Sequence, residues 1–295
     1  MKIPRSVCTD VRENVQMSGL TTFRVGGPCD LLCAPAGIWQ MADTLRLLSG
    51  AGYIVLGRCS NVLVADAGIR RPVIHTARLN HIEIEGSTIV AGAGAGLPEV
   101  ARAAAERGLA GMEWACGVPG SVGGAVVMNA GAYGGEMSQT LAAARVFDGE
   151  RVITVREFDF GYRHSIFHKY TDWVVIEATI KLLHGSKPDI EAQMTKLKRS
   201  RAKMQPVNLP SAGSFFKRPP GHYAGGLIEQ CGLKGASVGG AQVSERHAGF
   251  LVNTGGATCD DVLRLAALVR ETVYKQAGVT LEPEVRLLGD IRWPF

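Results

Sequence analysis

The sequence predicts an α+β protein built from two or three compact units. The chain has 295 residues, which is more than one typical domain core accommodates. Helical and strand-like patterns alternate along it without the regular spacing of βαβ repeats. Four prolines between Pro206 and Pro220 mark a candidate boundary before the C-terminal region. Hydrophobic residues make up 46% and charged residues 20%, as in ordinary globular proteins.

Hydrophobic periodicity and turn residues predict the individual elements. Pro98 lies in the first turn of a predicted helix that Gly108 ends, and Thr258 and Asp261 form a capping-box variant at the start of another. The expected helices are 36–50, 97–107, 189–204, 223–231 and 258–277. The expected strands are 53–56, 62–65, 73–75, 82–84, 88–91, 143–147, 152–155, 173–182 and 284–288.

Charge and cysteine content exclude several classes of protein. The net charge of +5 is small and dispersed, so no nucleic-acid partner is expected. Seven cysteines without a CxxC pair favour neither a disulfide framework nor structural zinc, and the spacing of His164, His168 and His247 suggests no metal. The N-terminus lacks an apolar signal core and no stretch approaches the ~20 apolar residues of a membrane span. We therefore expect a cytoplasmic protein without a membrane partner.

Glycine gathers in the centre of the chain. Residues 117–124 read Gly-Val-Pro-Gly-Ser-Val-Gly-Gly, and exposed backbone N–H groups in such a turn can cradle a pyrophosphate. The alternative is a tight turn that feeds a close-packed Ala/Gly helix. A second glycine loop, 57–61, lies between two predicted strands. The segment 92–96 has GxGxG spacing instead of GxGxxG, so a Rossmann domain is not predicted.

Several polar groups in apolar or turn contexts are candidates for chemistry, and each has an ordinary alternative. Ser214 is either a turn serine or a general acid whose proton affinity a nearby cation, Lys203 or Lys217, lowers. Arg163 is either a surface ion-pair partner or a planar fork for a carboxylate. Glu284 lies in an apolar strand, where it is either paired with a cation such as Arg286 or functional.

A basic run precedes the proline-rich segment. It is either a solvated helix face or a collar for an anionic ligand. Its members are Lys196, Lys198, Arg199, Arg201 and Lys203.

Taken together, these strings resemble the UDP-N-acetylenolpyruvoylglucosamine reductases, the MurB family. The resemblance covers nearly the whole chain, and each motif alone is weak whereas their order is specific. The matching segments are 21–27, 57–61, 117–124, 129–134, 162–165, 211–217, 239–244 and 282–286. The short interval between Arg163 and Trp173 resembles the class without the extra tyrosine lid loop.

The resemblance implies a fold and a domain division. It implies an FAD-binding region of the vanillyl-alcohol-oxidase (PCMH) type, made of two α+β subdomains, and a C-terminal substrate-binding α+β domain. The first subdomain would cover 1–76, joined by the tail 281–295. The second would cover 77–205, and the substrate-binding domain 206–280.

The resemblance also implies a reaction. An NADPH-dependent flavoenzyme with FAD would reduce UDP-N-acetylglucosamine enolpyruvate to UDP-N-acetylmuramate for peptidoglycan synthesis, and we expect a monomer. Ser214 would donate the proton, while Arg163 and Glu284 would stabilise the developing charge. Substrate contacts would fall on Tyr162, Lys203 and Lys217. Cofactor contacts would fall on Gly57, Ser60, Asn61, Gly117, Val118, Pro119, Gly120, Ser121, Gly124 and Gly131.

Two departures from the family pattern bear on this reading. In the loop 57–61, relatives often carry GGGSN, so either the side chains of Arg58 and Cys59 point away from FAD or the loop shifts. Arg218 replaces an asparagine that some members carry. The rival interpretations are a different flavoenzyme of the same fold, such as an oxidase, and a nucleotide-binding protein without catalysis.

Overall fold

The computed structural model describes residues 3–295 and divides the chain into two compact units. In its described part the first unit combines 3–13, Leu31–Arg58 and Arg71–Ser200, and the second combines Asn14–Asp30, Cys59–Arg70 and Arg201–Phe295. Helices and sheets occur in both units, so the predicted α+β class is confirmed. The three-domain division stays a prediction.

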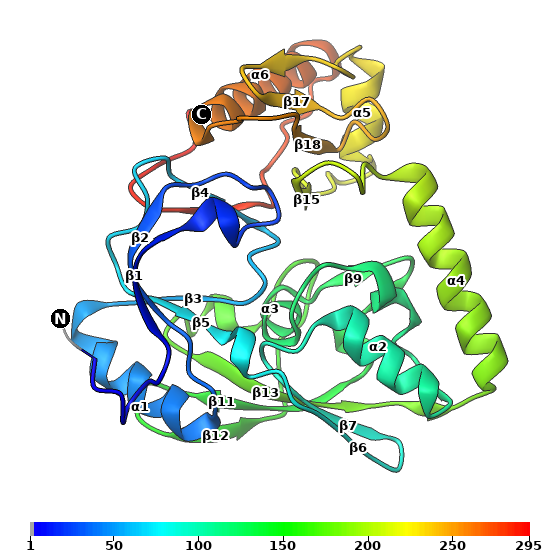
Figure 1. Ribbon diagram of the computed structural model, residues 1–295. Helices are drawn as coiled ribbons and strands as arrows, with labels where there is room; N and C mark the ends of the chain where they lie inside the picture. Colours follow the sequence, from blue (N-terminus) through cyan, green and yellow to red (C-terminus); the bar gives the residue numbers. More distant parts are fainter. Residues whose placement is uncertain (1–2) are drawn as a thin grey trace. The chain divides into compact units, whose positions relative to one another are not determined.

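The described part of the first unit contains two larger sheets and two sheets of two short strands each. A five-stranded antiparallel sheet has the order β12-β11-β13-β7-β6, and β3 and the end of β2 run parallel to β5 in a smaller one (Figure 1). The strands concerned are β2 (Pro28–Cys33), β3 (Ile54–Leu56), β5 (Val73–His75), β6 (Ile82–Glu85), β7 (Thr88–Gly92), β11 (Leu141–Phe147), β12 (Val152–Val155) and β13 (Val174–Lys181). Two-residue strands are β8 (Leu109–Ala110), β9 (Gly131–Ala132), β10 (Gly135–Glu136) and β14 (Leu183–His184).

Helices cover the sheets of this unit. The helices α2 (Leu97–Glu106) and α3 (Val122–Met128) pack on the five-stranded sheet through a core of small and branched residues, while α1 (Ile38–Leu48) closes a second core with the smaller sheet (Figure 1). The long helix α4 (Lys187–Met204) runs from this unit into the next. Predicted helix 97–107 matches α2, with Pro98 in its first turn and Gly108 at a φ of +65° just past its end.

The second unit is built around a four-stranded antiparallel sheet. Its order is β15-β18-β17-β16, and α5 (Ala224–Gln230) and α6 (Cys259–Ala277) bury a hydrophobic core against it (Figure 1). The strands are β15 (Ser211–Ser214), β16 (Ser237–Val238), β17 (Ala241–Val243) and β18 (Phe250–Asn253). The strand β1 (Val11–Gln16) begins in the first unit and ends in this one, whereas β2 begins in this unit and ends in the first.

The end of the chain returns to a segment from its beginning. Strand β19 (Arg286–Leu288) pairs in parallel with β4 (Val62–Val64), and Arg286 lies opposite Val62. The predicted strand 284–288 is therefore shorter than expected, because Glu284 precedes the parallel ladder. Among the described residues, no helix is long and apolar enough to cross a membrane.

Every amide in the first turn of α6 has an acceptor. Thr258 accepts from the amide of Asp261 at 3.1 Å, and the Asp261 carboxylate accepts in return, which confirms the predicted capping box. The carboxylate of Asp66 accepts from the amides of Cys259 and Asp260 at 2.8 and 3.1 Å. Asp66 follows β4, so this cap ties an N-terminal segment to the C-terminal helix of the same unit.

Candidate functional site

Two of the glycine-rich segments meet in the first unit. A methyl group at Gly57 would lie 2.0 Å from Oγ of Ser121, so only glycine allows this close approach. The amide of Leu97 donates to Gly120 at 3.0 Å and the amide of Val122 donates to Ala95 at 2.8 Å, which joins the segment 92–96 to the same place. Three segments that are separate in sequence therefore meet in one small, buried region.

Two buried hydroxyl groups lie close to each other in this region. The hydroxyl oxygen of Thr76 lies 3.9 Å from the position that a Gly57 methyl group would take, beside Ser121. Thr76 is 3% exposed, and within the part of the chain that the structure describes its hydroxyl has no hydrogen-bond partner. A buried hydroxyl without a partner is costly. Such a group, beside the close contact between Gly57 and Ser121, fits a ligand that brings acceptor oxygens.

Most amides of the predicted pyrophosphate cradle donate hydrogen bonds within the protein. The amides of Val118, Gly120, Val122 and Gly123 all donate to carbonyl oxygens of the same unit. Ser121 caps α3 by accepting from the amide of Gly124 at 3.4 Å. Glycine in this segment therefore serves close packing of backbone more than supply of donors, and the helix that we held as the alternative reading is present as α3.

In the loop 57–61, the two side chains that differ from the family pattern, Arg58 and Cys59, are both held by contacts within the protein. Arg58 donates to Glu99, in the first turn of α2, at 2.8 Å. Cys59 is 4% exposed and takes a left-handed conformation at a φ of +50°. Burial raises the pKa of Cys59 to about 12, so this thiol stays protonated and unreactive. The division between the two units falls in this loop, after Arg58.

His75 lies beside the same loop. The ring of His75, which pairs across β3 and β5 with Leu56, forms a hydrogen bond with the backbone of Gly57. Burial lowers the pKa of His75 below its usual value, and this effect outweighs the opposing bond to Gly57.

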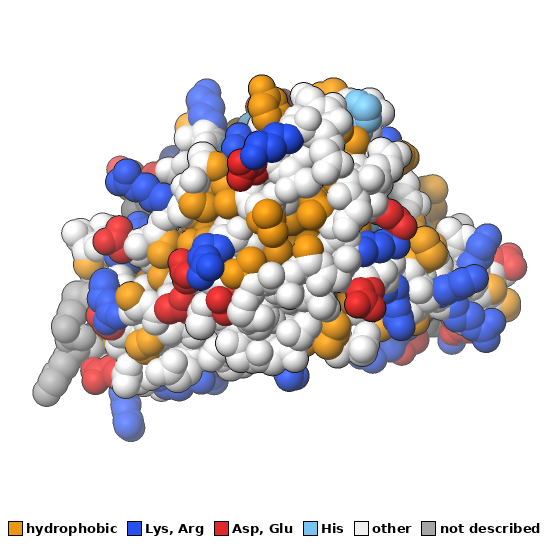
Figure 2. Space-filling view, turned by 90° about the horizontal axis from the view of Figure 1, so that it is seen from above, with side chains coloured by type: hydrophobic (Ala, Val, Ile, Leu, Met, Phe, Trp, Pro, Cys, Tyr) orange, Lys and Arg blue, Asp and Glu red, His pale blue; other side chains and the backbone are white. Residues whose placement is uncertain are grey.

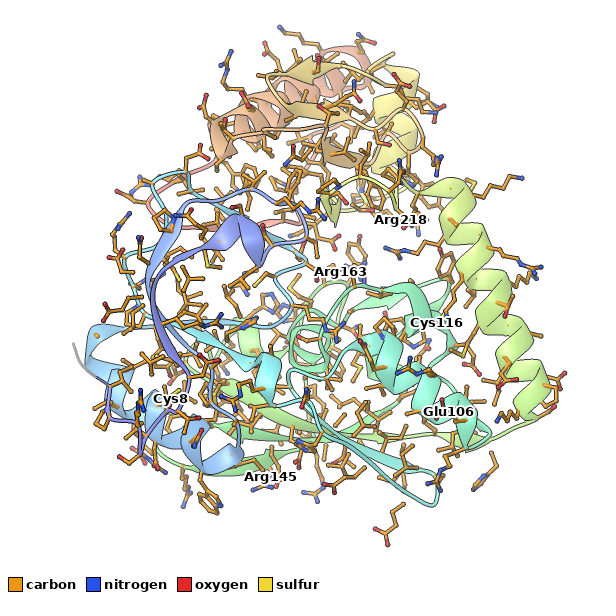
Figure 3. All side chains as sticks on the ribbon, viewed as in Figure 1. Cys8, Glu106, Cys116, Arg145, Arg163 and Arg218 are labelled. Carbon is orange, nitrogen blue, oxygen red and sulfur yellow. The ribbon has the colours of Figure 1, made fainter. Side chains whose placement is uncertain are left out.

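Arg163 lies in a tight turn of the first unit. Gly161 and His164 form a bridge around Tyr162 and Arg163, and Arg163 is left-handed at a φ of +54°. A non-glycine residue held in this conformation costs about 1–3 kcal/mol and is typical of functional sites. Its guanidinium donates to the Gly131 carbonyl at 3.5 Å and lies 5.1 Å from the centre of the Tyr162 ring. Figure 3 labels Arg163.

The glycine-rich helix positions this turn. The buried hydroxyl of Ser165 donates to the carbonyl of Val127 in α3 at 2.6 Å. Asn129, the left-handed residue at the end of α3, donates to Gly161 at 3.1 Å. Predicted residues Tyr162, Arg163 and Gly131 are thus brought together in the first unit.

Ser214 ends the edge strand β15 of the second unit. The register between β15 and β18 shifts between Ser211 and Ser214, where Gly213 has a φ of +82°. A bulge of this kind turns the next side chain out of the regular pleat. Ser214 is exposed, whereas Phe215 and Phe216 after it are buried in the core. The aromatic residues therefore anchor the strand end from which Ser214 projects.

Glu284 comes from a segment that pairs with the residues after Ser214. The amide of Glu284 donates to Phe215 at 2.9 Å, the amide of Lys217 donates to Glu282 at 2.8 Å, and Phe216 bridges Pro283. The amide side chain of Asn61 donates to the Glu284 carbonyl at 3.2 Å. The structure thus brings Ser214 and Glu284 onto adjacent segments of one unit, together with one predicted cofactor residue.

The predicted substrate lysines have different surroundings. Lys217 pairs with Glu282 at 3.4 Å in an exposed contact, and such surface pairs contribute only about 0–1 kcal/mol. Lys203 is exposed in the last turn of α4, the helix predicted at 189–204. Arg218, which Figure 3 labels, lies against the ring of Tyr223, with its guanidinium carbon 4.0 Å from the ring centre.

On the face shown in Figure 2, basic, acidic and hydrophobic side chains are interspersed, and no large patch of one charge is visible. Among residues 3–295, no group of three His, Cys, Asp or Glu side chains is placed to hold a metal ion.

Comparisons with known proteins agree with the features described above. The family model for the UDP-N-acetylenolpyruvoylglucosamine reductase C-terminal domain matches residues 205–288, and an FAD binding domain matches residues 29–154. These matches confirm the predicted FAD-binding region and C-terminal domain.

Similar proteins carry the same name. A UDP-N-acetylenolpyruvoylglucosamine reductase of Clostridium perfringens (strain SM101) is 47% identical over 95% of this chain and 93% of its own length. One from Clostridium botulinum (strain Hall) is 46% identical over 92% of this chain and 90% of its own. The crystal structure of the reductase from Thermus caldophilus superposes with a TM-score of 0.83 at 37% identity, covering 95% of this chain and all of that one.

Proposed function

The chain belongs to the UDP-N-acetylenolpyruvoylglucosamine reductase family, and from that premise we propose that it reduces UDP-N-acetylglucosamine enolpyruvate to UDP-N-acetylmuramate. It is an FAD-dependent oxidoreductase of peptidoglycan precursor synthesis with FAD and NADPH as its cofactors. When bound, FAD supplies hydride transfer from NADPH to the β-carbon of the enolpyruvyl group. We also propose that the protein is monomeric and cytoplasmic.

The residues that would hold FAD are those of the glycine segments. Gly57 and Ser121 are among them, and the hydroxyl of Thr76 adds a donor that sequence reasoning missed. Sequence could not reveal Thr76, since its environment depends on the packing of Gly57 and Ser121 against it. The other proposed contacts are Ser60, Asn61, Gly117, Val118, Pro119, Gly120, Gly124 and Gly131.

The substrate would be bound by charge and by an aromatic ring. Arg163 offers a planar fork for the enolpyruvyl carboxylate, and its position over Tyr162 limits its freedom before substrate arrives. Lys203 and Lys217 would contact the anionic nucleotide part, with Lys217 leaving Glu282 to do so. On binding, the substrate would have to displace only weak, exposed partners of these side chains.

The proton would come from Ser214. As the α-carbon beside the carboxylate becomes electron-rich, Arg163 and Glu284 would stabilise the developing charge. Ser214 would then donate its hydroxyl proton to the α-carbon and complete the lactyl ether. The observation that supports this assignment is the pairing of the segment after Ser214 with the segment that carries Glu284.

The visible spectrum of the purified protein tests the proposed function. We expect a yellow protein that NADPH bleaches without air and that the enolpyruvyl sugar nucleotide restores, with the lactyl ether detected by mass spectrometry. Arg163→Lys should keep the NADPH reaction and weaken the sugar reaction, because lysine cannot bind a carboxylate through two parallel bonds. A protein that oxygen recolours rapidly but the sugar does not would be an oxidase. One that takes up no flavin would be a binding protein.

A further inference from the structure

We propose that Arg270, Trp293 and Phe295 form a clasp that positions the segments bearing Ser214 and Glu284 for the reaction. The proposal rests on the roles given above to Ser214 and Glu284. The matched C-terminal family region ends at residue 288, so both aromatic members of the clasp lie outside it. All the contacts concerned lie within the second unit.

The aromatic members connect the end of the chain to the residue after Ser214. The ring of Trp293 meets the ring of Phe215 edge-on, with 5.8 Å between centroids and 84° between planes. Phe295 stacks on Trp293 at 5.7 Å. Phe215 is fully buried, whereas Trp293 is half-buried, so the contact runs from the core to the surface. Ring pairs of this geometry favour a fixed orientation.

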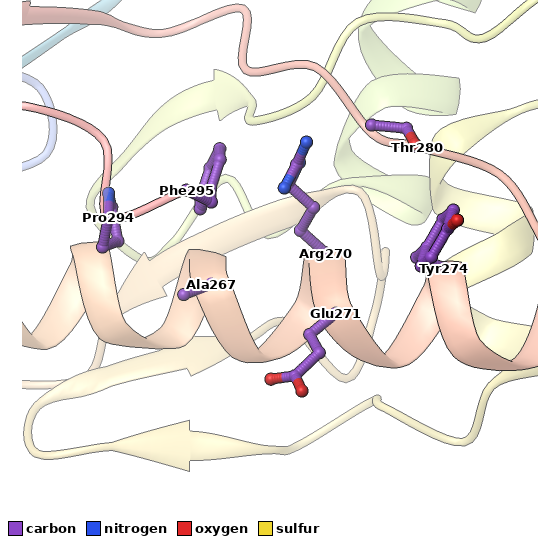
Figure 4. A pocket seen from close by; sticks show the side chains of 7 residues that line it. All are labelled: Ala267, Arg270, Glu271, Tyr274, Thr280, Pro294 and Phe295. Carbon is purple, nitrogen blue, oxygen red and sulfur yellow. The ribbon is translucent and has the colours of Figure 1, made fainter.

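Arg270 continues the connection to the segment bearing Glu284. Its guanidinium carbon lies 4.4 Å from the centre of the Phe295 ring, and its Nε donates to the carbonyl of Leu281 at 3.2 Å. Leu281 is buried and comes three residues before Glu284. Figure 4 shows Arg270 and Phe295 on one side of α6, while Glu271 points away from them. Arg270 therefore holds the tail and the Glu284 segment at once.

The contacts close into a circuit. From Leu281 the chain passes to Glu284, whose amide donates back to Phe215 at 2.9 Å. Each link restrains the two segments, so neither can slide along the other without breaking a contact. In order, the circuit is Phe215, Trp293, Phe295, Arg270, Leu281 and Glu284.

This circuit should matter to one half of the reaction only. A hydroxyl that donates a proton to carbon must be held close to it, and a misplacement of about 1 Å can cost about 10²-fold in rate. Reduction by NADPH uses neither Ser214 nor Glu284 in the proposed function. Loosening the clasp should therefore slow the sugar reaction selectively. A tail that merely stabilises the fold would affect both reactions through the amount of folded enzyme.

The test uses FAD-loaded enzyme and measures the two half-reactions separately by anaerobic stopped flow. We expect Trp293→Ala to lower the rate constant of the sugar reaction at saturating sugar about tenfold and to leave NADPH reduction within about twofold. Trp293→Phe should restore most of the rate, because it keeps a ring against Phe215. Tyr274→Ala is the matched control: Tyr274 is an exposed ring on α6 that lines one pocket together with Arg270 and Phe295 (Figure 4). It should behave as wild type.

A second readout follows the circuit without activity. In the flavin-free variant Trp293→Ala, hydrogen exchange at the amides of Glu284 and Lys217 should rise, while exchange in the first unit stays unchanged. If Trp293→Ala does not fold, Arg270→Lys replaces it, since lysine loses the Nε donor and the planar stack. Equal slowing of both half-reactions, or no slowing in a folded variant, overturns the proposal.

Ser214→Ala separates this inference from the proposed function. If Ser214→Ala stops the sugar reaction and Trp293→Ala leaves it unchanged, the clasp alone is wrong. If Ser214→Ala reduces the sugar at the wild-type rate, the proposed role of Ser214 is wrong. The proposed role of the clasp, which rests on it, is then wrong as well.

Discussion

Gly57→Ala tests the convergence of the glycine segments most sharply. The added methyl group would lie 2.0 Å from Oγ of Ser121 and 3.1 Å from its Cβ. Atoms in favourable contact lie about 3.5 Å apart, so the loop must retreat by about 1.5 Å or the hydroxyl must rotate away. Rotation gives up the bond from the amide of Gly124 at 3.4 Å. Overpacking of this kind costs ~1–3 kcal/mol.

The assay has two parts. Urea unfolding of the flavin-free protein should show the lost stability. Fluorescence titration should show FAD binding weakened about tenfold for each 1.4 kcal/mol of strain that the bound state retains. Gly50→Ala is the control, because within residues 3–295 no atom beyond its chain neighbours lies within 4 Å of its added methyl group, and it should stay within about 0.5 kcal/mol of wild type.

A double-mutant cycle assigns the cause. Ser121→Ala alone loses a helix cap worth about 1 kcal/mol, but in the Gly57→Ala background it also removes the clashing oxygen. We therefore expect the pair to be more stable than additivity predicts by about 1 kcal/mol or more. Strict additivity, or a Gly57→Ala variant as stable as Gly50→Ala, would refute the contact between these segments.

Three further predictions follow from the surroundings of single residues. Asp66→Ala should destabilise the protein by about 1–2 kcal/mol in urea unfolding, because it removes the cap on the amides of Cys259 and Asp260, whereas exposed Asp290→Ala should have little effect. The lowered pKa of His75 means that the unfolded chain takes up its proton first as pH falls below about 6.5, so the melting temperature should drop from pH 7.5 to 5, and less so in His75→Gln. Cys231 is the one cysteine that is not buried, so a thiol reagent at pH 8 should label one site quickly in the native protein and none in Cys231→Ser.

Local chemistry made many elements predictable from sequence. Thr258 and Asp261 marked the start of α6, and Pro98 and Gly108 bracketed α2, because capping and proline effects act within one turn. The strand β1 escaped prediction, since most of its residues are exposed and show no alternation. The sequence alone does not decide helix α3, because its glycines weaken helix propensity, although Ser121 and Asn129 cap it.

The site was predictable in its residue types more than in its arrangement. Resemblance to a family pointed to Ser214 and Glu284, but their proximity depends on pairing between segments that are far apart in sequence. No local pattern encodes that register. The buried hydroxyl of Thr76 went unnoticed for the same reason, since only the fold places it beside Gly57 and Ser121.

The most direct measurement of the central claim is a single turnover of Ser214→Ala without air. The flavin of this variant should be bleached by NADPH as fast as that of the wild type. Addition of the enolpyruvyl sugar should then return its colour at least about 10²-fold more slowly than in the wild type, since general acid catalysis contributes about 10²–10⁴-fold. Return of the colour at the wild-type rate would contradict the assignment of Ser214 as proton donor.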